Sequence, residues 1–410
     1  MSDLDDQIVD ILVIGAGPAG SISASILSQK GYKVKIVEKQ VFPRFVIGES
    51  LLPKCMENFE KAGFIEAIEK GGFQKKFGAK FIKGKQSCQF DFSEQFTDGY
   101  TWTWQVQRAK FDNLLAEEVV RKGTTVEFGS SLTDVEFKEN GTSISRISRS
   151  DGTTYSLEAK YLIDGSGYGR VIPKLLSLDK ESDFPPRASL FCHVLGTKKL
   201  KRDEEGQILV IVHSTDMWIW IIPFADGTHS LGVVGDTTII DRFHGSPEEK
   251  MKQLISETPE LKVRFQECEI LFPPRSITGY AKGIKKHFGK NFVLTGNSAE
   301  FIDPIFSSGV TFATESGVLA AELIHKQLSG EYVDWQREYS DYIQSGVDVF
   351  KTFVESWYDG SLQKIFFSNS SNDVIRKQIC SVLAGYVWDQ KNPFIRKHKR
   401  AIQALSAVLQ

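Results

Sequence analysis

A glycine motif near the N-terminus limits the fold of this chain more than any other feature of its sequence. Residues 8–14, I-V-D-I-L-V-I, are nearly all apolar and rich in β-branched side chains, as expected for a parallel strand buried on both faces. This strand runs directly into a G-x-G-x-x-G motif, and a helical pattern over residues 21–29 and a second strand follow. The order predicts a βαβ unit whose glycines are Gly15, Gly17 and Gly20.

The residue types in this unit indicate what it binds. Glycines permit the tight turn and let the backbone approach a pyrophosphate, and the helix N-terminus attracts the phosphates. Glu38 ends the second strand, where a carboxylate accepts hydrogen bonds from a ribose. We therefore predict a dinucleotide site that also includes Pro18, Ala19 and Lys39. FAD and NAD share this motif, so the motif alone leaves the choice open.

Composition excludes several other classes of protein. A chain of 410 residues is longer than one hydrophobic core usually organises, so we expect two or three structural units. Hydrophobic residues make up 41% of the chain and aromatic residues 11%, which excludes global disorder. A net charge of −2 gives no electrostatic case for a nucleic acid or an anionic membrane. A small molecule is the better expectation for the partner.

Cysteines, histidines and the N-terminus bear on metals and location. The five cysteines are scattered without a C-x-x-C pair, and the seven histidines show no metal-ligand spacing, so we expect neither a disulfide framework nor a metal site. Residues 1–7 are acidic where a signal peptide would be basic and then apolar. Apolar runs fall far short of the ~20 residues that a membrane helix needs. We expect a soluble, cytoplasmic protein.

Five further segments point to one dinucleotide and one family. They resemble the FAD contacts of flavoprotein monooxygenases, and among these the chain is similar to the flavin-dependent halogenases. The resemblance implies that Arg44, Ser50, Arg108, Asp164, Gly296 and Asp303 contact FAD. The segments are Phe42-Pro43-Arg44, Gly48 to Pro53, Gln105 to Asp112, Asp164 to Gly167, and Gly296 to Pro304.

The segment Trp218 to Pro223 is the most informative of the motifs, because it resembles the W-x-W-x-I-P signature of these halogenases. Residues two apart on a strand point to the same face, so Trp218 and Trp220 would place two indoles side by side. In the family such a pair is a wall that separates the flavin from the organic substrate. Two tryptophans on a strand are otherwise a common core pair, which is how we interpret Trp102 and Trp104.

A lysine forms the second halogenase feature. Lys76 lies downstream of the Gly48-Glu49-Ser50 segment, at the start of a predicted strand, where the resemblance places the active-site lysine. A lysine can hold or react with hypohalous acid, and burial readily lowers the pKa of its amine. Lys75 and Lys80 flank it, so a solvated basic face is the alternative interpretation.

The segment from Asp303 to Val310 opens a late helix and is the third feature. Free backbone N–H groups at a helix start bind anions. The resemblance implies that the amides of Ser308 and Gly309 hold the halide and that Gly309 and Val310 also contact FAD. Tryptophan halogenases carry a glutamate where this chain has Phe306, so the branch that acts on phenols and pyrroles is the better match.

These features predict an α/β fold of three units. Residues 1–86, 105–175 and 276–330 would form a discontinuous, doubly wound FAD-binding domain, residues 87–104 and 176–275 an antiparallel β substrate domain, and residues 331–410 a helical C-terminal cap. Within the cap, the basic run from Arg396 to Arg400 is either a solvated helix face or a dock for an acidic carrier protein.

The predicted activity is chlorination or bromination of an electron-rich aromatic ring, free or tethered to a carrier protein. Reduced FAD, O2 and halide would be required, and because no second G-x-G-x-x-G is present for NADPH, the electrons would come from a separate flavin reductase. Two alternatives share the scaffold: an FAD-dependent aromatic hydroxylase and an isoprenoid double-bond reductase. A third is a flavin-binding scaffold protein without turnover.

Overall fold

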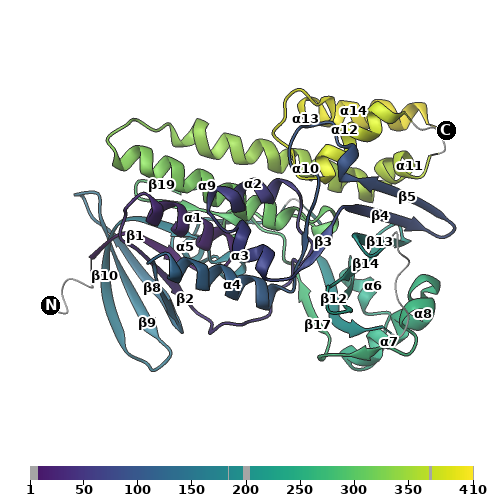
Figure 1. The fold of residues 1–410 in the computed structure, drawn as a ribbon, viewed down its shortest axis with the longest axis horizontal. Helices are drawn as coiled ribbons and strands as arrows, with labels where there is room; N and C mark the ends of the chain where they lie inside the picture. Colours follow the sequence, from purple (N-terminus) through teal and green to yellow (C-terminus); the bar gives the residue numbers. More distant parts are fainter. Residues whose placement is uncertain (1–7, 183, 197–203, 369–371, 410) are drawn as a thin grey trace.

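The computed structural model describes residues 8–182, 184–196, 204–368 and 372–409. Figure 1 shows one large sheet with its helices on the left, a second sheet on the right, and the C-terminal helices, in yellow, beside the second sheet. The acidic segment at residues 1–7 lies outside the described residues. Within the described ranges, no helix is long and apolar enough to cross a membrane.

The first sheet is built around the predicted βαβ unit. Strands β20, β10, β1, β2 and β7 run parallel, while β19 and the β8–β9–β10 meander add antiparallel neighbours. Its order is β19 (Phe288–Gly289), β20 (Phe292–Leu294), β10 (Thr154–Asp164), β1 (Ile8–Ile14), β2 (Val34–Glu38) and β7 (Thr125–Phe128), with β8 (Ser130–Phe137) pairing β9 (Ser143–Arg149). The carboxyl ends of β1, β2 and β10 meet at one edge, where ligands of open α/β sheets bind.

Two helices that are far apart in sequence cross closely over this sheet. Ser23 Oγ in α1 donates to the carbonyl of Gly317 in α9 at 3.1 Å. A Cβ added at Gly317 would lie 2.8 Å from the carbonyl oxygen of Ala19, so only glycine allows this approach. The helices of this part are α1 (Pro18–Gln29), α2 (Lys54–Lys61), α3 (Ile65–Lys70), α4 (Arg108–Arg121), α5 (Val171–Leu175) and α9 (Ser308–Leu328).

The second sheet is antiparallel except where β13 pairs with β4 in parallel. Its order is β16 (Glu269–Ile270), β12 (Arg187–Leu195), β15 (Thr228–Asp236), β14 (Met217–Pro223), β13 (Gln207–Ser214), β4 (Gly78–Lys83) and β5 (Gln86–Asp91), and β17 (Arg275–Thr278) also pairs with β12. Three helices pack beside it: α6 (Thr237–Ile240), α7 (Pro247–Glu257) and α8 (Pro259–Phe265).

The strands of this second sheet cross the predicted domain limits at two places. The predicted limit at residue 86 falls after the first residue of β5 and divides this strand from β4, its hydrogen-bonded neighbour. The limit at residue 276 falls inside β17. The physical reason is that an alternating strand pattern does not reveal its pairing partner, and β4 pairs with β13 more than a hundred residues later in the chain.

The C-terminal helices pack against core residues of both sheets. A π-helical segment (Gln336–Asp341) leads into α10 (Tyr342–Tyr358), and α11 (Ser361–Phe366), α12 (Asp373–Leu383), α13 (Pro393–Arg396) and α14 (His398–Val408) follow. Two short strand pairs complete the fold: β3 (Gln74–Lys76) with β6 (Thr103–Gln105), and β11 (Asp179–Lys180) with β18 (Gly283–Ile284). Lys76 thus ends a strand, whereas the sequence placed it at a strand's start.

Candidate active site

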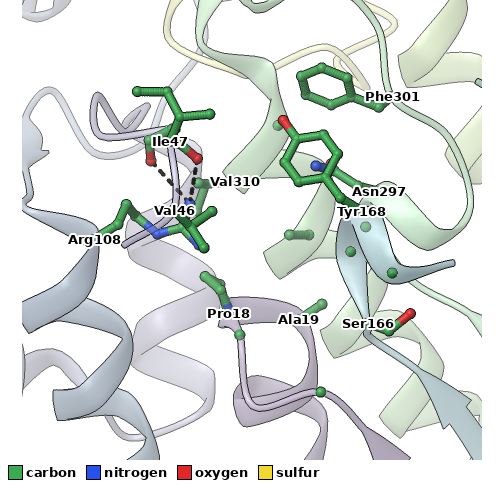
Figure 2. A pocket seen from close by; sticks show the side chains of 18 of the residues that line it. Pro18, Ala19, Val46, Ile47, Arg108, Ser166, Tyr168, Asn297, Phe301 and Val310 are labelled. Atoms are coloured by element: carbon green, nitrogen blue, oxygen red, sulfur yellow. Dashed lines mark hydrogen bonds between the residues drawn. The ribbon is translucent and has the colours of Figure 1, made fainter. Parts of the chain in front are cut away.

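A cavity of about 560 Å³ opens where the carboxyl ends of β1 and β2 meet the starts of α1 and α9. Figure 2 shows Pro18 and Ala19 at its floor, Arg108, Val46 and Ile47 on one side, and Tyr168, Asn297 and Phe301 on the other. Most residues that the sequence assigned to a cofactor line this cavity: Gly15, Gly17, Pro18, Ala19, Glu38, Lys39, Arg44, Ser50, Arg108, Gly296, Gly309 and Val310.

The three motif glycines have different tasks. Gly15 has a φ of +94° and a Cβ there would lie 2.7 Å from the carbonyl oxygen of Gly165. A Cβ at Gly20 would lie 2.0 Å from the carbonyl oxygen of Gly15, so this glycine allows α1 to pack on β1 and does not line the cavity. Gly17 differs, since a Cβ there would project toward the cavity with Arg44 Nη2 at 3.7 Å. Gly17 therefore leaves room for a ligand.

Glu38 and Ser50 present polar atoms to the same cavity. The Glu38 carboxylate accepts the backbone N–H of Ala16 and that of Gln40, both at 2.9 Å, which fixes it at the end of β2. Each oxygen keeps a lone pair for a ribose hydroxyl. The hydroxyl of Ser50 is buried and has no hydrogen-bond partner among the described residues. A buried polar atom without a partner at a cavity wall fits a bound polar ligand.

The two arginines share one buried carboxylate. Arg44 donates to Asp112 Oδ2 at 2.7 Å, and Arg108 donates to both oxygens of Asp112 at 2.7 and 2.9 Å. The remaining Arg108 nitrogen donates to the carbonyls of Ile47 and Gly48 at 3.2 Å, as the dashed lines in Figure 2 show. Arg44, next to Gly17, is thus the better placed of the two for phosphate, and Arg108 shapes the loop.

Two predicted carboxylates lie behind the cavity rather than in its lining. Asp164 is fully buried; its oxygens accept the backbone N–H groups of Ser166 and Ile172 and the hydroxyl of Ser298. It therefore holds the turn after β10. Asp303 is 4% exposed, and burial raises the pKa of its carboxyl to about 6.

Trp218 and Trp220 line the cavity from β14, as their spacing predicts. Their ring centroids are 5.8 Å apart. Trp220 donates its indole N–H to Ser230 Oγ at 3.0 Å and packs over Gly232 of β15, where a Cβ would lie 2.2 Å from the ring. We call this pair the tryptophan wall.

Lys76 lies outside the cavity lining and is 1% exposed. Its ammonium donates to the carbonyl of Leu51 at 2.8 Å, next to Ser50, and lies 5.3 Å from the ring centroid of Phe92. Burial lowers the pKa of the Lys76 amine to about 7, while Cys55 acts in the opposite direction. The solvated basic face is therefore excluded for Lys76, and only its neighbour Lys75 is exposed.

The start of α9 adjoins both regions. Ser307 has a φ of +59°, and the backbone then enters α9 at Ser308, where no side chain caps the helix. Ser307, Gly309 and Val310 line the cavity, whereas Ser308 is buried behind it. Thr311, in the first turn, lies 3.4 Å from the Cys55 sulfur. The free backbone N–H groups at the start of this long helix therefore point toward the cavity.

Sequence reasoning missed three aromatic rings of the cavity. Tyr168, Tyr280 and Phe301 all line it, and the Phe301 ring centroid is 5.4 Å from that of Tyr168 and 5.6 Å from that of Tyr280. Tyr168 directly follows the Asp164-Gly165-Ser166-Gly167 segment and Phe301 lies within the Gly296 to Pro304 segment. These neighbouring motif segments were the signal that could have identified Tyr168 and Phe301, whereas Tyr280 had no such signal.

Comparisons with known proteins agree with this geometry. Residues 8–262 match the family model of the FAD binding domain. A brominase of pyrrole-2-carbonyl peptidyl-carrier protein from Pseudoalteromonas luteoviolacea is 28% identical over 93% of this chain and 92% of its own length. A flavin-dependent halogenase of Armillaria mellea is 30% identical, covering 78% of this chain and 68% of its own.

A solved structure is similar over nearly the whole chain. It is a flavoprotein/dehydrogenase from Cytophaga hutchinsonii, with a TM-score of 0.96, 48% identity, and coverage of 98% of this chain and 99% of its own. The cavity, the glycine motif and the unpartnered Ser50 hydroxyl all fit FAD, which is the cofactor of this family.

Proposed function

Because the chain belongs to the flavin-dependent halogenases, within the family that carries the FAD binding domain, we propose that it attaches chlorine or bromine to an electron-rich, phenol- or pyrrole-like ring. When bound and reduced, FAD would supply the two electrons that activate O2, and the activated oxygen would oxidise the halide to electrophilic halogen. The residues of this chain would position the halide, separate the flavin from the ring, and deliver the halogen.

The observation that carries this proposal is the environment of Lys76. Its amine is buried beside Leu51 and Cys55, and the thiol of Cys55 contacts Thr311 in the first turn of α9. An amine with a pKa of about 7 is partly neutral at physiological pH. Such an amine can react with hypohalous acid as a nucleophile, and its protonated form can hold and polarise the acid by a hydrogen bond.

Other residues take supporting roles. The amides of Ser308 and Gly309 would hold the halide, since they begin the 21-residue helix α9 at the cavity's edge. The tryptophan wall would keep the organic ring away from the flavin. Glu38 would bind the ribose and Arg44 the pyrophosphate.

The aromatic surroundings of Phe306 support the substrate class. Phe306 packs edge-on against Phe353 and Trp357, with ring centroids 6.1 and 6.0 Å apart, and Trp357 in turn contacts Phe81 at 5.5 Å. An apolar group here, instead of a glutamate, favours a ring activated by its own oxygen or nitrogen over free tryptophan. The pyrrole-acting relative, matched over 92% of its length, also supports this class.

Partners and location follow from the same proposal. The single G-x-G-x-x-G motif supports a separate flavin reductase as the electron source. All five cysteines carry free thiols, which supports the reducing environment of the cytoplasm.

The test is stopped-flow oxidation of the FAD-loaded, pre-reduced protein in oxygenated buffer, with and without chloride or bromide. Active halogen is trapped with monochlorodimedone, and Lys76→Ala is compared with Lys75→Ala. We expect the reoxidation to depend on halide. Only Lys76→Ala should fail to retain the oxidising halogen. Pyrrole-2-carboxylate, free and on a carrier protein, and a phenol then identify the substrate form. Halide-independent reoxidation, together with direct oxidation of NADPH by the protein alone, would overturn the proposal in favour of a hydroxylase or dehydrogenase.

A further inference from the structure

Three side chains from three parts of the chain form a hydrogen-bonded series beside the cavity. The indole N–H of Trp218 donates to the hydroxyl of Tyr358 at 3.0 Å, and that hydroxyl donates to Asp303 Oδ2 at 2.9 Å. Trp218 belongs to β14 of the second sheet, Asp303 precedes the short helix before α9, and Tyr358 ends α10. One hydroxyl group therefore connects the C-terminal helices to the tryptophan wall and to the start of α9.

The donor and acceptor groups fix the direction of these two hydrogen bonds. An indole N–H can only donate, so the Tyr358 oxygen must accept from Trp218 and direct its own proton to Asp303. Burial raises the pKa of Tyr358 well above its ordinary value, so the phenol stays neutral and remains a donor. A hydrogen bond to an ionised carboxylate is stronger than one to its neutral form. The strength of the series therefore depends on the charge of Asp303.

Neighbouring groups from every packed element complete the environment of Asp303. Its other oxygen accepts the backbone N–H of Ile305 at 3.0 Å. Arg187 of β12 stacks on the Tyr358 ring, with its guanidinium carbon 3.8 Å from the ring centroid, and Tyr280 faces Asp303 from the segment between β17 and β18. Burial opposes the ionised carboxylate, while the hydrogen bonds from Ile305 and Tyr358, the charge of Arg187 and the nearby Tyr280 hydroxyl favour it.

We propose that Tyr358 is a positioning residue of the enzyme: it holds the Trp218 indole in the tryptophan wall and links this indole to Asp303. The role of the tryptophan wall rests on the proposed function, whereas the hydrogen bonds of Tyr358 to Trp218 and Asp303 do not depend on it. Trp218 is 2% exposed and lines the cavity, so a change in its orientation changes the shape of the cavity wall.

The indole N–H of Trp218 reports on this link directly. FAD-loaded protein is labelled with 15N-indole tryptophan, and the Trp218 resonance is assigned by its absence in Trp218→Phe. In the wild type we expect this resonance to shift with pH, with a midpoint near the pKa of about 6 of Asp303. In Tyr358→Phe the resonance should move upfield, exchange faster with solvent and lose the pH dependence. Asp303→Asn should keep the hydrogen bond but abolish the titration.

Tyr342→Phe is a matched control at the other end of the same helix. The Tyr342 hydroxyl also donates to a carboxylate, Glu315 Oε1, at 2.7 Å, but it does not contact the wall. This variant should leave the Trp218 resonance and its titration unchanged. A Trp218 resonance that is pH-independent in the wild type, or that responds equally to both tyrosine variants, would overturn the proposal.

A second measurement separates this proposal from the proposed function. The yield of oxidising halogen that escapes to monochlorodimedone should rise in Tyr358→Phe, with the halide dependence of flavin reoxidation unchanged. If the wild-type flavin proves indifferent to halide, the proposed function fails, but the indole resonances still decide whether Tyr358 positions Trp218. If halogen is formed and the resonances do not respond, only the role of Tyr358 fails.

Discussion

Replacing Lys76 with methionine should stabilise the protein, and by an amount that falls as the pH rises. Burial lowers the pKa of Lys76 from its ordinary value of 10.5 to about 7. At about 1.4 kcal/mol for each pH unit, an ionised Lys76 costs about 5 kcal/mol of folding free energy at low pH. Methionine is apolar and similar in length, so it avoids this cost.

The sign of the pH dependence follows from the two pKa values. Between pH 7 and 10.5 the unfolded chain holds the Lys76 proton and the folded chain does not, so the wild type gains stability as the pH rises. The methionine variant lacks this gain. The carbonyl of Leu51 loses its donor in the variant, an offset of about 1–3 kcal/mol that does not depend on pH. The advantage of methionine should therefore fall by about 3 kcal/mol between pH 6 and pH 9.

Urea unfolding at pH 6, 7.5 and 9, with FAD in fixed excess, measures this difference. Lys75→Met is the control, because Lys75 is the exposed neighbour and its ammonium lies over the Trp102 ring at 4.3 Å. Its effect on unfolding should be the same at every pH. A difference between Lys76→Met and wild type that stays constant from pH 6 to pH 9 would refute the inference that the buried amine loses its proton near neutrality.

Four further variants test the cofactor site and the tryptophan wall. Gly17→Ala should weaken FAD binding by about tenfold or more in a fluorescence titration with little change in urea unfolding, because the new methyl group points toward the cavity. Gly20→Ala should instead lower the free energy of unfolding, since its Cβ would lie 2.0 Å from a backbone oxygen; equal effects of both variants on FAD affinity and unfolding would contradict this division. Arg44→Gln should weaken FAD binding by about 1.5–3 kcal/mol, the worth of a charged hydrogen bond, measured by the same titration. Gly232→Ala should cost about 1–3 kcal/mol of stability in urea unfolding and alter tryptophan fluorescence, because its Cβ would lie 2.2 Å from the Trp220 ring.

The parts of the site that the sequence predicted are those with local patterns. The glycine turn joins a strand to a helix within a few residues, so its geometry follows from neighbours in the chain. The placement of Trp218 and Trp220 on one face follows from the two-residue repeat of a strand, and both residues do line the cavity.

Features that depend on contacts between residues far apart in the sequence could not be predicted. No local pattern shows that β4 joins the second sheet or that Arg44 and Arg108 share Asp112. Asp164 was assigned to the cofactor because it lies in a familiar segment, yet its carboxylate accepts hydrogen bonds from its own turn. Tyr358 lies 55 residues after Asp303, so only the fold brings them together.

The close crossing of α1 and α9 has a consequence for how the protein is made. Ser23 and Gly317 are 294 positions apart, and the cavity includes residues from Ile14 to Ala313. During synthesis, the βαβ unit emerges first but lacks the helix that completes its site. FAD can therefore stabilise the protein only after most of the chain has left the ribosome. Until then the early strands lack their long-range partners, and their apolar faces and edges stay open to aggregation.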